Sequence, residues 1–137
     1  YESIKFGKQD FMIAGGAEEL SVSEAVMFDV LYATSTKNKY PKQTPAPFDK
    51  NRDGVVIGEG AATLILENLE SAQERGAAIY AELVGYGANS DGEHLTAPAV
   101  SGMKKVMLLA LEDANLTPEA IGYVNAHGTA TEVGDIA

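Results

Sequence analysis

Residues 11–16 read Phe-Met-Ile-Ala-Gly-Gly, and this short stretch decides which kind of fold the chain can build. Four apolar residues that end at a pair of glycines are typical of a strand buried on both faces. Residues 1–6, just before it, are expected to form the end of a helix, because Gly7 is a usual left-handed helix stop. A helix followed by a doubly buried strand indicates a sheet that lies between helices.

The rest of the chain continues this alternation. An acidic helical stretch is expected from Glu18 to about Val30, and prolines forbid regular structure in the long loop at residues 34–48. That loop is a candidate lid or substrate wall, since long loops are often functional in compact domains. Further strands are expected at residues 55–57, 62–66, 81–86 and 123–125, and further helices at residues 70–75 and 101–114. This order predicts a layered α/β fold.

Composition and charge narrow the class of protein. The 137 residues are 45% hydrophobic and 22% charged, as in a globular domain or part of one. A formal net charge of -10 argues against binding to nucleic acid or anionic lipid, and no apolar run approaches the roughly 20 residues of a membrane-spanning helix. The absence of cysteine fits a reducing compartment and favours a cytoplasmic location. Because the chain begins at Tyr1 rather than Met and stops directly after a glycine-containing loop, we expect an internal piece of a longer protein.

Residues 125–131 combine a histidine, two hydroxyls and a glycine just after a predicted strand, where α/β sheets usually bind their ligands. The imidazole of His127 can donate a hydrogen bond to a developing oxyanion, and threonine hydroxyls can bind the amides of an extended ligand. An equally weighted alternative is a histidine that caps a strand end, with threonines that shape a turn. The other histidine, His94, lies in a polar turn and is interpreted as a solvated loop residue.

Residues 49–54 follow the D-x-N-x-D-G pattern that opens a calcium-binding loop. The pattern then fails, because Gly60 stands at the twelfth position, where the bidentate glutamate belongs. The favoured interpretation is a turn in which Asp49 and Asp53 accept hydrogen bonds from backbone amides while Arg52 pairs with a carboxylate. Two isolated histidines without cysteine also argue against zinc, so no metal site is expected.

Several segments, taken in order, resemble the β-ketoacyl-acyl-carrier-protein synthases, the condensing enzymes of the thiolase-like superfamily. The segments are residues 10–18, Phe28 with residues 35–37, residues 47–54 with 58–61, and residues 127–131 with 134–135. The resemblance covers essentially the whole chain. It implies a partial thiolase-like layered α/β fold, in which residues 1–77 end the N-terminal half and residues 78–137 start the C-terminal half.

The resemblance also implies an acyltransferase that condenses acyl thioesters with malonyl-acyl-carrier protein in fatty-acid or polyketide synthesis. By motif match, His127 is the first of the family's two catalytic histidines, and Phe28 lines the acyl pocket. Thr129 and Thr131 would bind the phosphopantetheine arm of the substrate. Two further residues, Asp135 and Asn125, would be structural neighbours of the site. The implied partner is acyl-carrier protein, which carries phosphopantetheine with the substrate; no cofactor of the enzyme's own is implied, and the parent enzyme is expected to be a homodimer.

The departures from the family pattern limit what this chain can do alone. The family's nucleophilic cysteine and its second histidine motif are both absent, so the chain by itself is expected to be inactive. Three alternatives stay open: a non-catalytic module that binds pantetheine or acyl-carrier protein or serves assembly, a calcium-binding loop protein, and a decarboxylase in which the cysteine is replaced.

Overall fold

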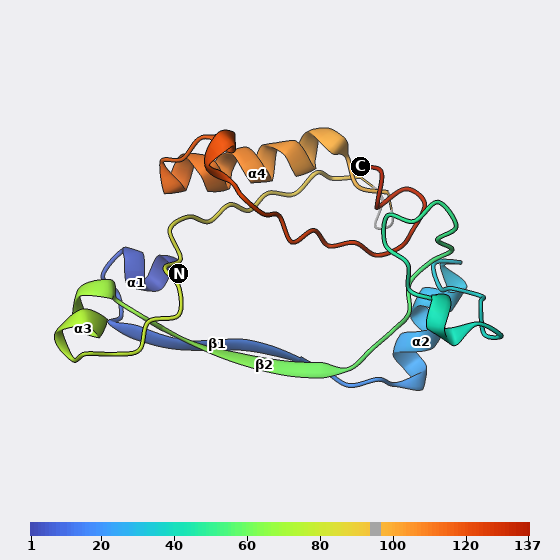
Figure 1. Ribbon diagram of the computed structural model, residues 1–137, viewed down its shortest axis with the longest axis horizontal. Helices are drawn as coiled ribbons and strands as arrows, with labels where there is room; N and C mark the ends of the chain where they lie inside the picture. Colours follow the sequence, from blue (N-terminus) through green and yellow to red (C-terminus); the bar gives the residue numbers. More distant parts are fainter. Residues whose placement is uncertain (94–96) are drawn as a thin grey trace.

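The computed structural model describes residues 1–93 and 97–137. Its elements, in chain order, are α1 (Glu2–Lys5), β1 (Phe11–Glu18), α2 (Val22–Val30), the 3-10 turn η1 (Pro41–Gln43), β2 (Gly60–Glu67), α3 (Leu69–Glu74), α4 (Val100–Ala114) and the 3-10 turn η2 (Pro118–Ala120). Figure 1 shows the sheet formed by β1 and β2 on one side of the molecule and α4 on the other. The prediction for His94 lies outside the described residues.

Strands β1 and β2 form an antiparallel pair with Phe11 opposite Glu67 and Glu18 opposite Gly60. β2 confirms the strand expected at residues 62–66. β1 is longer than expected, because it continues through the glycine pair instead of ending there. A side chain at Gly15 would collide with the backbone of Ala62, so this glycine permits close approach of the partner strand.

The prediction that β1 is buried on both faces is wrong for this chain. Its two largest apolar side chains, Phe11 and Ile13, are 62% and 67% exposed. The apolar pattern of the sequence predicts which side chains favour burial. Burial also requires another layer of structure to lie against them, and the described residues of this chain place none there.

The predicted helices are largely confirmed. α1 ends at Lys5, with Gly7 two residues later at a φ of 66°, and α4 covers the helix expected at residues 101–114. α3 begins at an Asn68 cap whose side chain accepts hydrogen bonds from the next turn. The acidic helix was predicted to start too early: α2 begins after the Ser21 cap, because residues up to Glu18 belong to β1.

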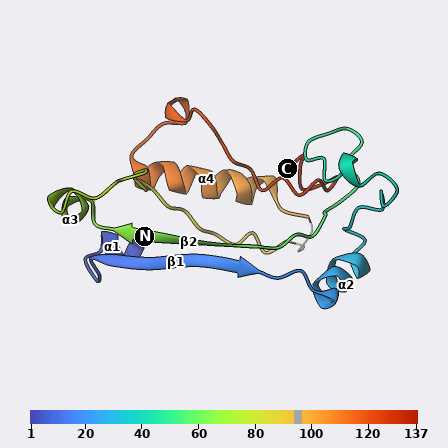
Figure 2. The same cartoon turned by 60° about the horizontal axis from the view of Figure 1, so that its bottom comes forward.

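Three of the predicted strands do not form. At residues 55–57 only Val55 makes a bridge, with Thr34. Residues 81–86 and 123–125 run as extended chain beside α4 but have no ladder partner among the described residues, as Figures 1 and 2 show. A strand needs a hydrogen-bonded neighbour, so an apolar pattern alone does not produce one.

The extended segment at residues 81–88 packs closely on α4. A Cβ added to Gly85 would lie 2.5 Å from the carbonyl oxygen of Ala110, and one added to Gly87 would lie 2.6 Å from that of Val106. These glycines therefore permit contact between two backbones. Such contact is typical of a sheet strand covered by a helix, even though the strand's own ladder is missing.

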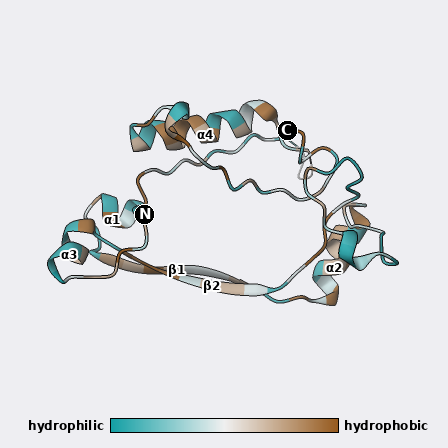
Figure 3. Cartoon of the chain, viewed as in Figure 1, coloured by the Kyte–Doolittle hydropathy of each residue, from teal (hydrophilic) through white to brown (hydrophobic). Residues whose placement is uncertain are grey.

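The described residues do not enclose a core of their own. The accessible surface of the chain is 10907 Å², whereas a compact monomer of 14.4 kDa exposes about 6,800 Å². Among the described residues, Ala72 and Ala130 are the only buried hydrophobic residues. Figure 3 shows hydrophobic residues on the strands as well as on α4, on opposite sides of an open arrangement. No helix in the described part of the chain is long and apolar enough to span a membrane.

Candidate functional site

The candidate site forms where residues 49–54, here called the Arg52 turn, meet residues 127–135, here called the His127 loop. The amide of Gly54 donates to the carbonyl of Ala130 over 2.9 Å. On the other side, the amide of Val55 donates to Ala33 over 2.8 Å and its carbonyl accepts from Ser35 over 2.9 Å. The Arg52 turn therefore lies between two segments that are far apart in the sequence.

Arg52 is the main link between the turn and the loop. Its Nε donates to the carbonyl of Thr131 over 2.9 Å, and its Nη2 donates to that of Glu132 over 2.7 Å. Its Nη1 donates over 3.0 Å to the carbonyl of Asp49 within the turn. The guanidinium therefore bonds three carbonyls, which suits its rigid fork of donors.

The carboxylate of Asp135 lies beside Arg52 and is 1% exposed. One oxygen accepts from the amide of Phe48 over 2.7 Å, and the other accepts from the amide of Ala130 over 3.1 Å. The Nε of Arg52 lies 3.5 Å away and balances the charge. The predicted pairing of Arg52 with a carboxylate is thus confirmed, and its partner is more than eighty residues away.

The predicted hydrogen bonding of the turn's two aspartates is confirmed as well. Asp49 accepts from the amide of Asn51 over 2.7 Å, and Asp53 accepts from the amide of Thr36 over 3.0 Å. The two carboxylates serve separate loops. Within the described part of the chain, no group of three or more His, Cys, Asp or Glu residues lies together as metal ligands would.

Partial burial raises the pKa of Asp53, but hydrogen bonds from the Ser35 hydroxyl and the Thr36 amide outweigh it, with help from the charge of Lys37. The net effect lowers the pKa below its ordinary value. Asp53 therefore stays ionised and holds the start of the long loop against the Arg52 turn.

The two threonines of the His127 loop face each other. Their Oγ1 atoms are 2.9 Å apart, and the amide of Gly134 donates to the hydroxyl of Thr131 over 3.1 Å. Between them, Ala130 is fully buried with a left-handed φ of 61°. That conformation costs a non-glycine residue about 1–2 kcal/mol, so the bonds at both of its peptide groups must hold it.

His127 is exposed and directly precedes Gly128, which has a φ of 54°. A Cβ on Gly128 would lie 3.3 Å from the ring of Phe48, so this aromatic ring packs against the backbone next to the histidine. Asn125 is exposed, two residues before His127 on the extended segment. The imidazole therefore lies at the end of an extended segment with hydroxyls after it and an aromatic ring beside it.

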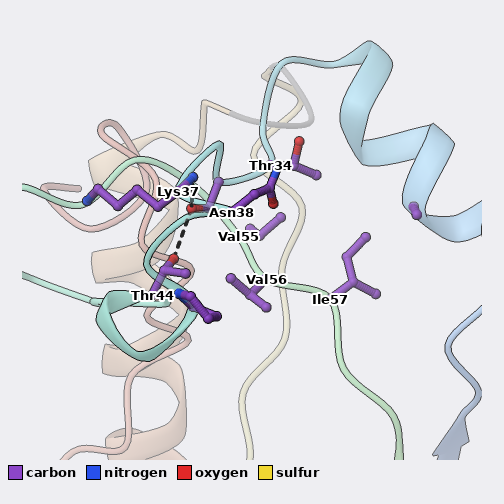
Figure 4. A pocket seen from close by; sticks show the side chains of 10 residues that line it. Thr34, Lys37, Asn38, Thr44, Val55, Val56 and Ile57 are labelled. Atoms are coloured by element: carbon purple, nitrogen blue, oxygen red, sulfur yellow. Dashed lines mark hydrogen bonds between the residues drawn. The ribbon is translucent and has the colours of Figure 1, made fainter.

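Phe28 lies elsewhere, half-buried on α2. A hollow of about 320 Å³ opens beside that helix, and Figure 4 shows residues that line it, including Thr34, Lys37 and Val56. The loop predicted as a candidate substrate wall forms one side of it, where Thr44 bonds the hydroxyl of Ser35 over 3.0 Å. His127 does not line this hollow, so we place the candidate chemistry at the His127 loop, where the polar groups converge.

The structure gives roles to two residues that the sequence analysis included in its motifs without assigning them one. Phe48 contributes both a backbone amide to Asp135 and a ring beside Gly128. Gly54 fits only because its missing side chain would otherwise lie 2.7 Å from the carbonyl carbon of Thr34. The one available signal was the run at residues 47–54, in which proline, aromatic, acidic and glycine residues crowd together.

Comparison with known families identifies the class of protein. The family model described as "Beta-ketoacyl synthase, N-terminal domain" matches residues 1–72, and the one described as "Beta-ketoacyl synthase, C-terminal domain" matches residues 80–137. The chain belongs to the β-ketoacyl synthase family.

Individual relatives agree with this membership. The 3-oxoacyl-[acyl-carrier-protein] synthase 2 of Vibrio cholerae is 47% identical over 137 residues, which are 98% of this chain and 33% of the relative. The crystal structure of a β-ketoacyl synthase from Burkholderia phymatum is 61% identical with a TM-score of 0.97, covering 99% of this chain and 33% of that one. The chain thus spans about a third of the length of its relatives.

A second similar structure holds a type II polyketide-synthase acyl-carrier protein in complex with its ketosynthase bound to the hexaketide. It is 38% identical with a TM-score of 0.93, and it covers 98% of this chain and 34% of that one. These structures confirm the predicted fold class: the chain is a partial thiolase-like α/β fold.

Proposed function

We propose that this chain is the part of a condensing enzyme that holds the carrier-linked malonyl thioester and supplies one of its catalytic histidines. The single observation that carries the proposal is the geometry of the His127 loop. Its exposed imidazole precedes two threonine hydroxyls whose Oγ1 atoms are 2.9 Å apart, on either side of the buried Ala130. The whole enzyme would join an acyl group to malonyl-acyl-carrier protein in fatty-acid or polyketide synthesis.

His127 would act as a hydrogen-bond donor. When the malonyl carboxylate leaves as carbon dioxide, the electrons of the broken carbon–carbon bond move into the thioester, and negative charge develops on its oxygen. An imidazole N–H aimed at that oxygen stabilises the enolate. The enolate carbon then attacks the acyl thioester on the enzyme's cysteine, and the sulfur leaves as thiolate.

Thr129 and Thr131 would bind the amides of the phosphopantetheine arm. Each hydroxyl offers one proton and two lone pairs. The two oxygens already share one hydrogen bond, and Thr131 also accepts from the amide of Gly134. The remaining proton and lone pairs can bond an extended ligand that lies along the loop. Phe28 would line the acyl pocket from α2, and Asp135 and Asn125 would support the site.

This chain contains no cysteine, so alone it would form no acyl-enzyme and would condense nothing. We propose that residues 1–77 and 78–137 belong to the two halves of the larger fold, which the separate family matches support. The exposed apolar faces of β1 and α4 support packing against the rest of a longer protein. Acyl-carrier protein as partner and a homodimeric parent belong to the same proposal.

A hybrid enzyme tests the proposal. The host is the Burkholderia phymatum β-ketoacyl synthase with its matching segment replaced by this chain, a substitution that the 61% identity favours. We expect the hybrid to condense acyl and malonyl thioesters. His127→Ala should slow malonyl decarboxylation about a hundred- to a thousandfold, while acyl loading of the host's cysteine changes much less.

Two outcomes would contradict the proposal. One is a folded hybrid that loads neither acyl group nor malonyl thioester. The other is a His127→Ala hybrid that decarboxylates normally and has lost only acyl loading, because the histidine would then serve the cysteine and not the enolate.

A further inference from the structure

Arg52 is the most fully bonded cation in the part of the chain that the structure describes, although the proposed chemistry does not use it. Its side chain is 12% exposed, and each of its three nitrogens donates to a different carbonyl. Two of these carbonyls belong to Thr131 and Glu132, seventy-nine and eighty residues away. The guanidinium therefore donates its hydrogen bonds to the backbone of the His127 loop and to none of its side chains, so these bonds depend on the path of the chain and not on which residues form it.

The carboxylate of Asp135 also holds the His127 loop in place. It is 1% exposed and receives the amides of Phe48 and Ala130, while the Nε of Arg52 lies 3.5 Å away. A buried ion pair is strongly destabilised when one of its partners is removed. Arg52 is the charged partner of this carboxylate, so the position of the carboxylate, and of the two amides bound to it, depends on Arg52.

Thr131 transmits this arrangement to the site. Its carbonyl is held by Arg52, and its hydroxyl is held by Thr129 and the amide of Gly134. The preceding residue, Ala130, is fixed at both peptide groups by Asp135 and Gly54. A shift of the guanidinium would therefore move the Thr131 backbone and change the spacing between the hydroxyl pair and His127.

We propose that Arg52 is a positioning residue for the His127 loop: it sets the distance between His127 and the two threonine hydroxyls through the carbonyls of Thr131 and Glu132. This inference rests on the proposed function. Lysine could replace the charge beside Asp135 but not the planar fork that bonds two successive carbonyls. Arg52 touches neither substrate nor reacting atoms, so its effect should appear as lost alignment.

The hybrid enzyme described above provides the test, with Arg52→Lys and Arg52→Met as variants. Matched controls are Arg75→Lys and Arg75→Met. Arg75 is likewise an arginine paired with a carboxylate, since two of its nitrogens bond Glu67, but its side chain is 61% exposed and it lies at the end of α3. The amount of acyl group loaded on the host's cysteine measures how much of the enzyme is folded. The kcat and KM of malonyl decarboxylation are then measured per loaded site.

We expect Arg52→Met to lower kcat/KM for decarboxylation about a hundredfold, as misplacement by about 1 Å can do. Arg52→Lys should lose about tenfold, since it keeps the charge but only part of the bonding. Acyl loading should stay within about twofold, and both Arg75 variants should match the unmodified hybrid. A purely structural role would instead lower the folded fraction and leave the rate per loaded site unchanged.

The proposal is overturned if Arg52→Lys decarboxylates at the unmodified rate, or if loading and decarboxylation fall by the same factor in both Arg52 variants. If Arg52→Met does not fold, the lysine variant alone decides. An active hybrid that is insensitive to Arg52 contradicts only this inference, whereas an unmodified hybrid that fails to condense contradicts the proposed function and this inference together.

Discussion

Two charged clusters join segments that are far apart in the sequence, and they differ in burial. In the first, Asp113 on α4 accepts from the Tyr1 hydroxyl over 2.6 Å and pairs with Lys5, and the two charged side chains are 30% and 37% exposed. In the second, Arg52 and Asp135 are 12% and 1% exposed. Water screens the first pair and hardly reaches the second.

The difference indicates what each cluster does for the molecule. An exposed pair gains little, because water competes for both charges and each long side chain loses freedom. A nearly buried pair is costly to break, because the partner left behind has lost its solvent. The first cluster thus attaches α1 loosely to α4, whereas the second determines the backbone path at the candidate site.

The sharpest way to break this comparison is to remove the buried carboxylate. In the hybrid, Asp135→Ala leaves Arg52 without its anion and two amides without their acceptor. We expect the free energy of unfolding to fall by about 3 kcal/mol, measured by denaturant titration, with loss of decarboxylation. Asp113→Ala serves as the exposed control and should have a clearly smaller effect. Equal losses in the two variants would show that burial does not separate the clusters.

Two glycines with positive φ sharpen the same comparison. Gly7 closes α1 near the exposed cluster and has open space around it, whereas a side chain on Gly54 would strike the backbone of Thr34. Gly7→Ala should cost about 1 kcal/mol from conformation alone. Gly54→Ala should cost a further 1–3 kcal/mol or so from overpacking. Thermal unfolding of both variants measures the difference. Equal losses of stability would mean that the Arg52 turn can shift to accommodate the added methyl group.

The smallest expected effect concerns pH. Hydrogen bonds from the Lys5 ammonium and then from the Tyr1 hydroxyl lower the pKa of Asp113 from 3.8 to about 2. Folding therefore favours the carboxylate, so the stabilisation is present above pH 3.8 and disappears as the pH falls through about 2. Comparing Asp113→Asn with the unmodified hybrid should show a stability gap that closes in this window. A gap that persists at pH 2 would mean that Asp113 acts through packing instead of charge.

Local features of the chain could be predicted because their causes lie within a few residues. The helix stop at Gly7, the helix at residues 101–114 and the amide-bonded turn around Asp49 each depend on neighbours in the sequence. The strands predicted at residues 81–86 and 123–125 do not form, because a ladder needs a second strand, and none lies beside them among the described residues. The apolar pattern indicates that these segments favour a sheet, but it does not provide the neighbouring strands that a sheet needs.

By itself the sequence determined the family, the helices and the motif that places His127 before two threonines, since these depend on residue order alone. Only the tertiary structure decided how that motif is held. The bonds from Arg52 to Thr131 and Glu132, and those from Asp135 to Phe48 and Ala130, join backbone groups that carry no side-chain signature. Any residue offers a carbonyl or, proline excepted, an amide, so only the folded path of the chain reveals which ones the buried charges bind.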